Sequence, residues 1–192
     1  MRGALKRMPV QIGTKAHNFS DPTGLMSDCH RRIEMFLGTL ETVAAVIDSP
    51  ASEETNRALE SALHYFGQAA PKHNADEEDS LFPRLRQIQH ADIQFSFSQL
   101  ERLEEEHRWA APFHAEIERL GTQYLSTGSL SDTEIGNFRS AVTRLASMYK
   151  QHIDIEDSVI FPLAERLLSQ ADKMAIGEEM ANRRGLSRGD LR

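Results

Sequence analysis

Apolar residues recur at steps of three and four along most of the chain, which is the spacing of one face of an α-helix. The first such stretch begins near Leu25, after the turn signal Asp21-Pro22-Thr23-Gly24. It is expected to end at Asp48-Ser49-Pro50, and Ser52 is placed to cap the next helix. The inward positions of this first helix are Met26, His30, Ile33, Leu37, Leu40, Ala44 and Ile47. A histidine therefore takes one place in an apolar stripe.

The second apolar stripe contains two prolines. Pro71 has no amide hydrogen for a helical hydrogen bond, so a bend is expected just before His73, and Pro83 is expected to bend the helix again. The inward positions of this stretch are Leu59, Leu63, Phe66, Ala70, His73, Glu77, Leu81 and Ile88. An ionisable pair, His73 and Glu77, thus lies on a face that is expected to be buried.

Two further helices follow a connection around residues 89–94. The third is expected to end before Gly128, and the fourth to begin after a cap at Ser131-Asp132. The inward positions of the third are Leu100, Leu103, His107, Ala111, His114, Ile117 and Tyr124. Those of the fourth are Phe138, Val142, Leu145, Tyr149, His152, Glu156, Val159 and Leu163.

These patterns predict an all-α fold, an up-and-down four-helix bundle over residues 25–170. Residues 1–24 are expected to form an irregular N-terminal arm. Residues 171–192 are expected to form a short C-terminal helical extension, with an amphipathic stretch from Met174 to Met180. A chain of 192 residues with 40% hydrophobic residues can bury the core of one such domain.

Composition limits the binding partners and the cellular location that are expected of the protein. A formal net charge of −7 argues against a broad contact with nucleic acid. Cys29 is the single cysteine, so an internal disulfide is excluded and a reducing cytoplasm is the expected location. The sequence has no run of about 18 apolar residues and no secretion signal near Met1, so neither a membrane span nor export is expected.

One arrangement of residues occurs twice: a histidine, a glutamate four residues later, and a Phe-Pro pair beginning five residues after the glutamate. The copies are His73, Glu77 and Phe82-Pro83, and His152, Glu156 and Phe161-Pro162. Four residues make one helical turn plus about 40°, so each His and Glu project side by side. A lone histidine precedes each copy at a nearly equal interval, His30 in the first half and His107 in the second. Two helical hairpins, each with three such side chains, are therefore expected to face one another.

Buried imidazoles and carboxylates need ion pairs, hydrogen bonds or metal ions. A hydrogen-bonded core is the simpler interpretation of any one histidine, but a repeated set of six favours metal. The predicted ligands are His30, His73, Glu77, His107, His152 and Glu156. Imidazole with carboxylate suits iron, manganese or zinc, and two carboxylates can bridge two ions.

Counting donors indicates an open site. If both glutamates bridge, each ion receives two carboxylate oxygens and two imidazoles from the protein, so an octahedral ion keeps about two positions for water or another ligand. A purely structural tetrahedral site would be closed. Ala110 and Ala111 stand one turn beyond His107 and are expected to leave space there.

The chain resembles the hemerythrin-like, or HHE cation-binding, domain family. The segments that carry the resemblance are Asp21-Pro22, residues 28–34, residues 73–83, residues 152–162 and the tail segment 176–185. The resemblance implies a four-helix bundle with a non-haem di-iron centre, an oxygen-bridged pair of iron ions. Across the family it implies oxygen binding, oxygen, redox or iron sensing, and peroxide or nitric oxide chemistry.

Two departures from the oxygen carriers of that family affect the prediction. The carriers place a second histidine four residues after the helix-three histidine, where this chain has Ala111, and His114 is about 10 Å along the helix from His107, too far to replace it. The carriers also use an aspartate five residues after the last histidine, here Asp157. Glu156 fits the apolar stripe better, and Asp157 remains the alternative ligand. The missing imidazole argues against reversible oxygen carriage.

Two classes of function follow. The first is a binding or sensing protein whose di-iron centre takes up oxygen, nitric oxide or iron and signals through a partner protein or a homo-oligomer. The second is an oxidoreductase, peroxidase-like, catalase-like or consuming nitric oxide. A structural bundle holding zinc or manganese is a third possibility.

Other polar residues have simpler expectations. Glu34 is expected to pair with Arg31 rather than to bind metal, and Tyr149 to pack in the core rather than to contact a ligand of the metal. Cys29 is expected to be a reduced thiol. The acidic runs 104–106 and 78–79 are expected to be solvated faces.

Overall fold

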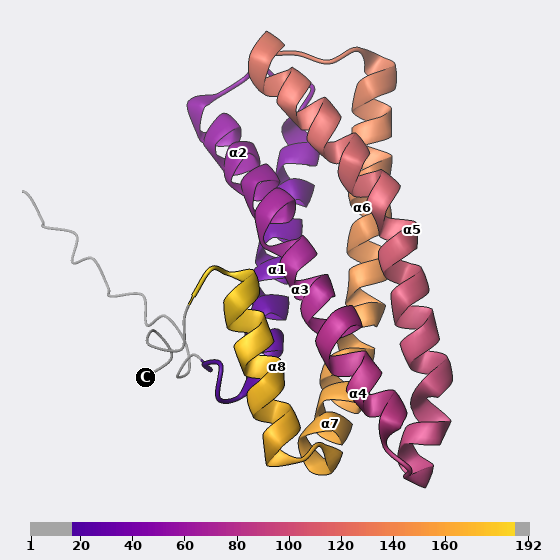
Figure 1. Ribbon diagram of the computed structural model, residues 1–192. Helices are drawn as coiled ribbons and strands as arrows, with labels where there is room; N and C mark the ends of the chain where they lie inside the picture. The colour runs from indigo at the N-terminus through magenta and orange to yellow at the C-terminus, as the bar shows by residue number, and fades with distance from the viewer. Residues whose placement is uncertain (1–16, 187–192) are drawn as a thin grey trace, which may run out of the picture.

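The computed structural model describes residues 17–186, and Figure 1 shows them as long helices lying side by side. The elements are α1 (Pro22–Val46), α2 (Glu53–Gln68), α3 (Ala70–Ala75), η1 (Asp76–Leu81), α4 (Phe82–Gln87), α5 (Ala91–Thr127), α6 (Asp132–Ile155), η2 (Glu156–Ile160), α7 (Phe161–Leu167) and α8 (Gln170–Arg183). Within this range there are no strands, so the predicted all-α class is confirmed. The first 16 residues of the predicted N-terminal arm, and residues 187–192 of the extension, lie outside it.

Four rods of helix form the bundle. They are α1, the run from α2 to α4, α5, and the run from α6 to α7. Helix α1 packs against α2 and α6, and α5 packs against the same two helices. Short connections between neighbours in this ring give the expected up-and-down order.

Local signals in the sequence fix where the helices begin and end. The side chain of Asp21 caps α1 by accepting from the Gly24 amide, so α1 begins at Pro22, slightly before the expected start. Ser52 caps α2 as predicted, and Ser131 caps α6. Gly128 ends α5 with a φ of 76°, a left-handed conformation that suits glycine.

Both histidine-glutamate copies run into a π-helical turn, η1 and η2, just before their Phe-Pro pairs. The predicted bend at Pro71 is present as the break between α2 and α3, but the π turns were not predicted. A π turn holds one extra residue and shifts the faces of the helix beyond it. The expectation that Val159 faces inward is therefore wrong: its exposure is 42%, and Ile160 is fully buried instead.

The apolar core has two clusters, one at each end of the bundle. Three rods pass from one cluster to the other at a histidine, and the fourth does so just after His152. On α1, Met26 belongs to one cluster and Ile33 to the other, with His30 between them. On α5, Leu103 and Ala110 lie in different clusters on either side of His107. The histidines thus form a polar layer sealed by hydrophobic residues above and below.

Helix α8 is part of this packing. Ile176 and Met180 are fully buried, and α8 contacts both α1 and η1. Gly177 lies so close to the N-terminal segment that a Cβ atom there would collide with the carbonyl oxygen of Phe19. In the described part of the chain, no helix is both long enough and apolar enough to cross a membrane.

Replacing Gly177 by alanine should lower the free energy of unfolding by about 1–3 kcal/mol, because the methyl group meets backbone that cannot move alone. The matched control is Gly136→Ala on α6, where an added Cβ meets nothing within 4 Å. That change should stabilise the protein by about 0.5–1 kcal/mol through helix propensity. Urea denaturation measures both, and equal effects of the two changes would contradict the close packing at Gly177.

Candidate metal centre

The six predicted ligands converge in the polar layer between the two apolar clusters. They come from all four rods: His30 on α1, His73 on α3, Glu77 on η1, His107 on α5, His152 on α6 and Glu156 at the start of η2. All six side chains are buried, and both glutamates are fully buried. The repeat in the sequence thus becomes a pair of hairpins that face one another across this layer.

The candidate ligand atoms form two groups of four that share both glutamates. His30 and His73 complete one group, and His107 and His152 the other. Within each group the ligand atoms lie within 4.8 Å of one another. This is the arrangement of donors that a pair of metal ions bridged by two carboxylates requires.

Each glutamate turns one oxygen toward each group. Glu77 Oε1 lies 3.1 Å from His73 Nε2, and Glu77 Oε2 lies 3.6 Å from His107 Nε2. Glu156 Oε2 lies 3.1 Å from His30 Nε2, and Glu156 Oε1 lies 3.2 Å from His152 Nε2. Both carboxylates therefore span the two groups rather than belonging to one.

These short distances do not satisfy the buried atoms by hydrogen bonding. Both oxygens of Glu77 and of Glu156, and Nε2 of His30 and of His73, have no hydrogen-bond partner among the described residues. Buried polar atoms left in this way are rare in proteins and costly. A cation in each group would give every one of them a partner, so the residues fit a metal pair.

A ring of outer carboxylates fixes the orientation of three imidazoles. The Nδ1 atom of His30 lies 2.9 Å from Asp157 Oδ1, and that of His107 lies 2.7 Å from Glu78 Oε1. A carboxylate accepts from an Nδ1–H, which leaves the Nε2 lone pair free to bind metal. The alternative ligand Asp157 thus contacts a histidine from outside and belongs to neither donor group.

The third outer carboxylate is Glu106, whose Oε2 lies 3.0 Å from His152 Nδ1. Nε2 of His107 and Nε2 of His152 lie 3.0 Å apart, and both histidines belong to the second donor group.

The expectation that Glu78 and Glu106 belong to solvated acidic faces is wrong, because each accepts from a buried histidine. The sequence carried a signal for one of them. An acidic residue directly follows the buried glutamate in both copies, Glu78 after Glu77 and Asp157 after Glu156. Their matching positions correspond to matching contacts with the lone histidines His107 and His30.

Two expectations about helix α5 have different outcomes. Ala111 was expected to face inward, but it is exposed, and its neighbour Ala110 is buried. The inward face of α5 therefore contains the third residue after His107 and not the fourth. His114 lies outside both donor groups and its Nε2 is 3.0 Å from the hydroxyl of Tyr149. Tyr149 itself packs in the core, as expected.

The pKa values in the layer are shifted by burial and by the close approach of its charged groups. Burial raises the pKa of Glu77 to about 8 and holds that of His73 well below its usual value. Burial opposes charge on His30, but its hydrogen bond to Asp157 and the nearby glutamates raise its pKa to about 11. Protons and metal ions compete for these donor atoms, because a donor has to lose its proton before it can bind a metal.

The residue before Glu77 is held by α8. Asp76 is fully buried, and its oxygens accept from Arg183 Nη1 at 2.9 Å and from Arg184 Nη2 at 2.6 Å. Arg183 also donates to Ser80 Oγ at 2.7 Å. The end of α8 therefore fixes the π turn from which Glu77 projects. This contact joins residues far apart in the chain, so it leaves no local pattern in the sequence.

A family model for the hemerythrin HHE cation binding domain matches residues 21–164. The chain belongs to this family. The match includes parts of all four rods and every residue of the two donor groups. The hemerythrin-like chain is also 24% identical to an uncharacterized protein of Haemophilus influenzae, over 92% of this chain and 95% of that protein. The predicted resemblance is thus confirmed, and with it a domain whose family binds metal cations.

Replacing Glu106 by glutamine should weaken metal binding by about 10- to 100-fold, since loss of an outer carboxylate makes the imidazole of His152 a poorer ligand. The control is Glu105→Gln, an exposed neighbour with the same change in charge. Competition with a chromogenic chelator measures both affinities. Equal losses would mean that net charge, rather than the contact with His152, is responsible.

Replacing Asp76 by asparagine should lower the free energy of unfolding by about 3 kcal/mol, because two guanidinium groups lose their shared buried counter-charge. Asp79→Asn is the matched control, since the Asp79 side chain is 70% exposed in the same turn. Its effect should stay within about 0.5 kcal/mol. Denaturation with urea gives the two values, and a small loss in Asp76→Asn would show that α8 is held by apolar packing alone.

Proposed function

We propose that this hemerythrin-like protein holds two iron ions as a non-haem di-iron centre and binds a small molecule such as oxygen or nitric oxide there in a sensing or redox role. The proposed ligands are His30, His73, Glu77, His107, His152 and Glu156. The observation that carries the proposal is the pair of four-atom donor groups that share both glutamates. Iron pairs supply reversible one-electron chemistry and bind such ligands.

The donor set supports iron over a structural zinc. It consists of imidazole and carboxylate groups alone, and Cys29 belongs to neither donor group. Four protein donors leave an octahedral ion about two further positions. Manganese fits the same donors, and zinc would fill a four-coordinate site, so the metal itself has to be measured.

The residues around the proposed centre keep it dry and rigid. Phe161 stacks on the His30 ring with centroids 5.2 Å apart, and Phe82 is fully buried in the cluster on the same side. The outer carboxylates hold the proton of three imidazoles on Nδ1, so each Nε2 faces inward without rotating. Such a preorganised layer favours reversible binding of a small ligand over loss of the metal.

The missing imidazole supports sensing rather than carriage. The position where oxygen carriers have their additional histidine is Ala111, which is exposed on α5. A sensor has to pass its state to another molecule, and we propose that a partner protein or a second copy of the chain takes this role. A cytoplasmic location agrees with the lone cysteine.

One observation favours an oxidoreductase as the second candidate, peroxidase-like, catalase-like or consuming nitric oxide. The buried Tyr149 hydroxyl and His114 Nε2 lie 3.0 Å apart, and the Tyr149 ring meets that of His152 edge-on with centroids 6.0 Å apart. A phenol and an imidazole in contact can pass a proton through a dry core. Turnover of peroxide by the iron-loaded protein, lost in His152→Ala, would support this role over sensing.

Metal analysis tests the centre directly. Protein made in iron-supplemented cells and purified without metal affinity should hold close to two irons per chain by elemental analysis. Glu77→Ala and Glu156→Ala should each cut that content sharply, because each removes one ligand from both groups. Glu34→Ala is the control, since Glu34 is exposed and pairs with Arg31. A single zinc, or full loading in both glutamate variants, would overturn the proposal.

A further inference from the structure

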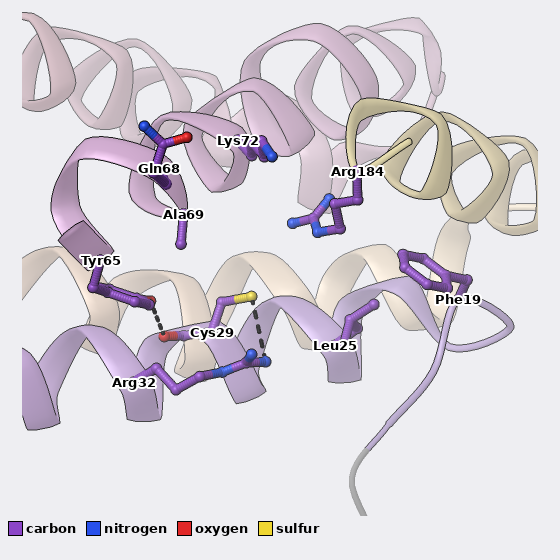
Figure 2. A pocket seen from close by; sticks show the side chains of 9 residues that line it. All are labelled: Phe19, Leu25, Cys29, Arg32, Tyr65, Gln68, Ala69, Lys72 and Arg184. Carbon is purple, nitrogen blue, oxygen red and sulfur yellow. Dashed lines mark hydrogen bonds between the residues drawn. The ribbon is translucent and has the colours of Figure 1, made fainter. Parts of the chain in front are cut away.

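A pocket of about 320 Å³ opens beside the polar layer (Figure 2). Cys29 and Arg32 line it from α1, Lys72 from α3, and Arg184 from the residue after α8. In Figure 2 the guanidinium group of Arg184 lies between Lys72 and Cys29, and Leu25 and Phe19 form one end. None of the nine described residues that line the pocket is acidic.

Only one of the three basic side chains of this pocket has a carboxylate partner among residues 17–186. Arg184 pairs with Asp76, which also accepts from Arg183. Arg32 donates to the Asp28 carbonyl oxygen and lies 3.9 Å from Cys29 Sγ. Such a cluster is unexpected in a chain with a net charge of −7.

The second half of the chain has a hollow at the matching place. In the sequence repeat, His107 corresponds to His30 and His152 to His73. The residue before each histidine then corresponds as well, so Glu106 matches Cys29 and Gln151 matches Lys72. Both Glu106 and Gln151 line that hollow. Pseudo-symmetry therefore relates the two pockets. Their chemistry differs, because a carboxylate in one is a thiol in the other.

The difference matters for the histidines. Glu106 accepts from His152 Nδ1, but the corresponding atom, His73 Nδ1, is buried without a hydrogen-bond partner among the described residues. The first half thus lacks the built-in carboxylate of the second and carries three basic side chains around the same place.

We propose that this pocket binds a small organic oxyanion, a carboxylate or a phosphate monoester, through Arg32, Lys72 and Arg184. Guanidinium and ammonium groups are the natural donors for such oxygens. The apolar part of the ligand packs against Leu25 and Phe19. A pocket of this volume suits a ligand of a few carbon atoms, since pockets for drug-sized molecules start at about 300 Å³.

Cys29 provides a reporter inside the pocket, because the chain has no other cysteine. The rate at which dithiobis(nitrobenzoate), a disulfide reagent with two carboxylates, labels Cys29 should fall when inorganic phosphate or acetate occupies the pocket. An anion at ten times its Kd should slow labelling about tenfold, since only empty pockets react. Chloride at equal ionic strength should not do so. The stronger of the two competitors identifies the head group.

Charge variants give the specific control. Arg32→Gln and Lys72→Gln should abolish the competition, and Arg57→Gln should keep it, because Arg57 is 74% exposed at the start of α2 and pairs with Glu53. Circular dichroism verifies that each variant is folded. The competition measured in the wild-type protein tests the proposal even if a variant does not fold. Phosphate and acetate that act no more strongly than chloride would overturn the proposal, as would full competition in both pocket variants. The assay needs no iron, so it fails or succeeds independently of the di-iron proposal.

Discussion

Two carboxylates buried at the centre of a helical bundle set the conditions for the rest of this structure. Glu77 and Glu156 have no access to water, so protein groups or cations have to balance them. Charge alternates outward from these two groups. Imidazoles surround the glutamates, carboxylates contact the imidazoles, and arginines pair with carboxylates, as Arg31 does with Asp157 and Arg102 with Glu106. The helices of the bundle hold these oppositely charged groups in alternating shells around the two glutamates.

The apolar clusters on either side make the alternation possible. Each rod has to bring its ligand to one level while its neighbouring residues join different clusters. A displacement of one helix along its axis would therefore move a charged group into an apolar cluster. Packing and electrostatics thus select the same register of the four rods, which is the consistency expected of a sequence that specifies one fold.

Features that depend on local spacing could be predicted from the sequence. Ser52 and Ser131 cap helices where the pattern placed them, and the two histidine-glutamate copies project their side chains toward one level. Whether those side chains bind iron remains a prediction. The π turns could not be predicted, because a single extra residue per turn leaves no periodic signal. The exposure of Val159 follows from that shift.

Contacts between distant segments were also out of reach. Glu106 belongs to an acidic run typical of a solvated face, and only the approach of α6 brings it to a histidine. The division of residues 1–192 into arm, bundle and extension stays a prediction. Within the predicted extension, Gly177 packs tightly against the N-terminal segment and α8 contacts α1 and η1.

The contact between Asp76 and the end of α8 has a consequence for the protein during its synthesis on the ribosome. Synthesis proceeds from the N-terminus, so η1 leaves the ribosome long before Arg183 and Arg184 exist. Asp76, beside the proposed ligand Glu77, therefore gains its two guanidinium partners only after almost all of residues 17–186 have been translated.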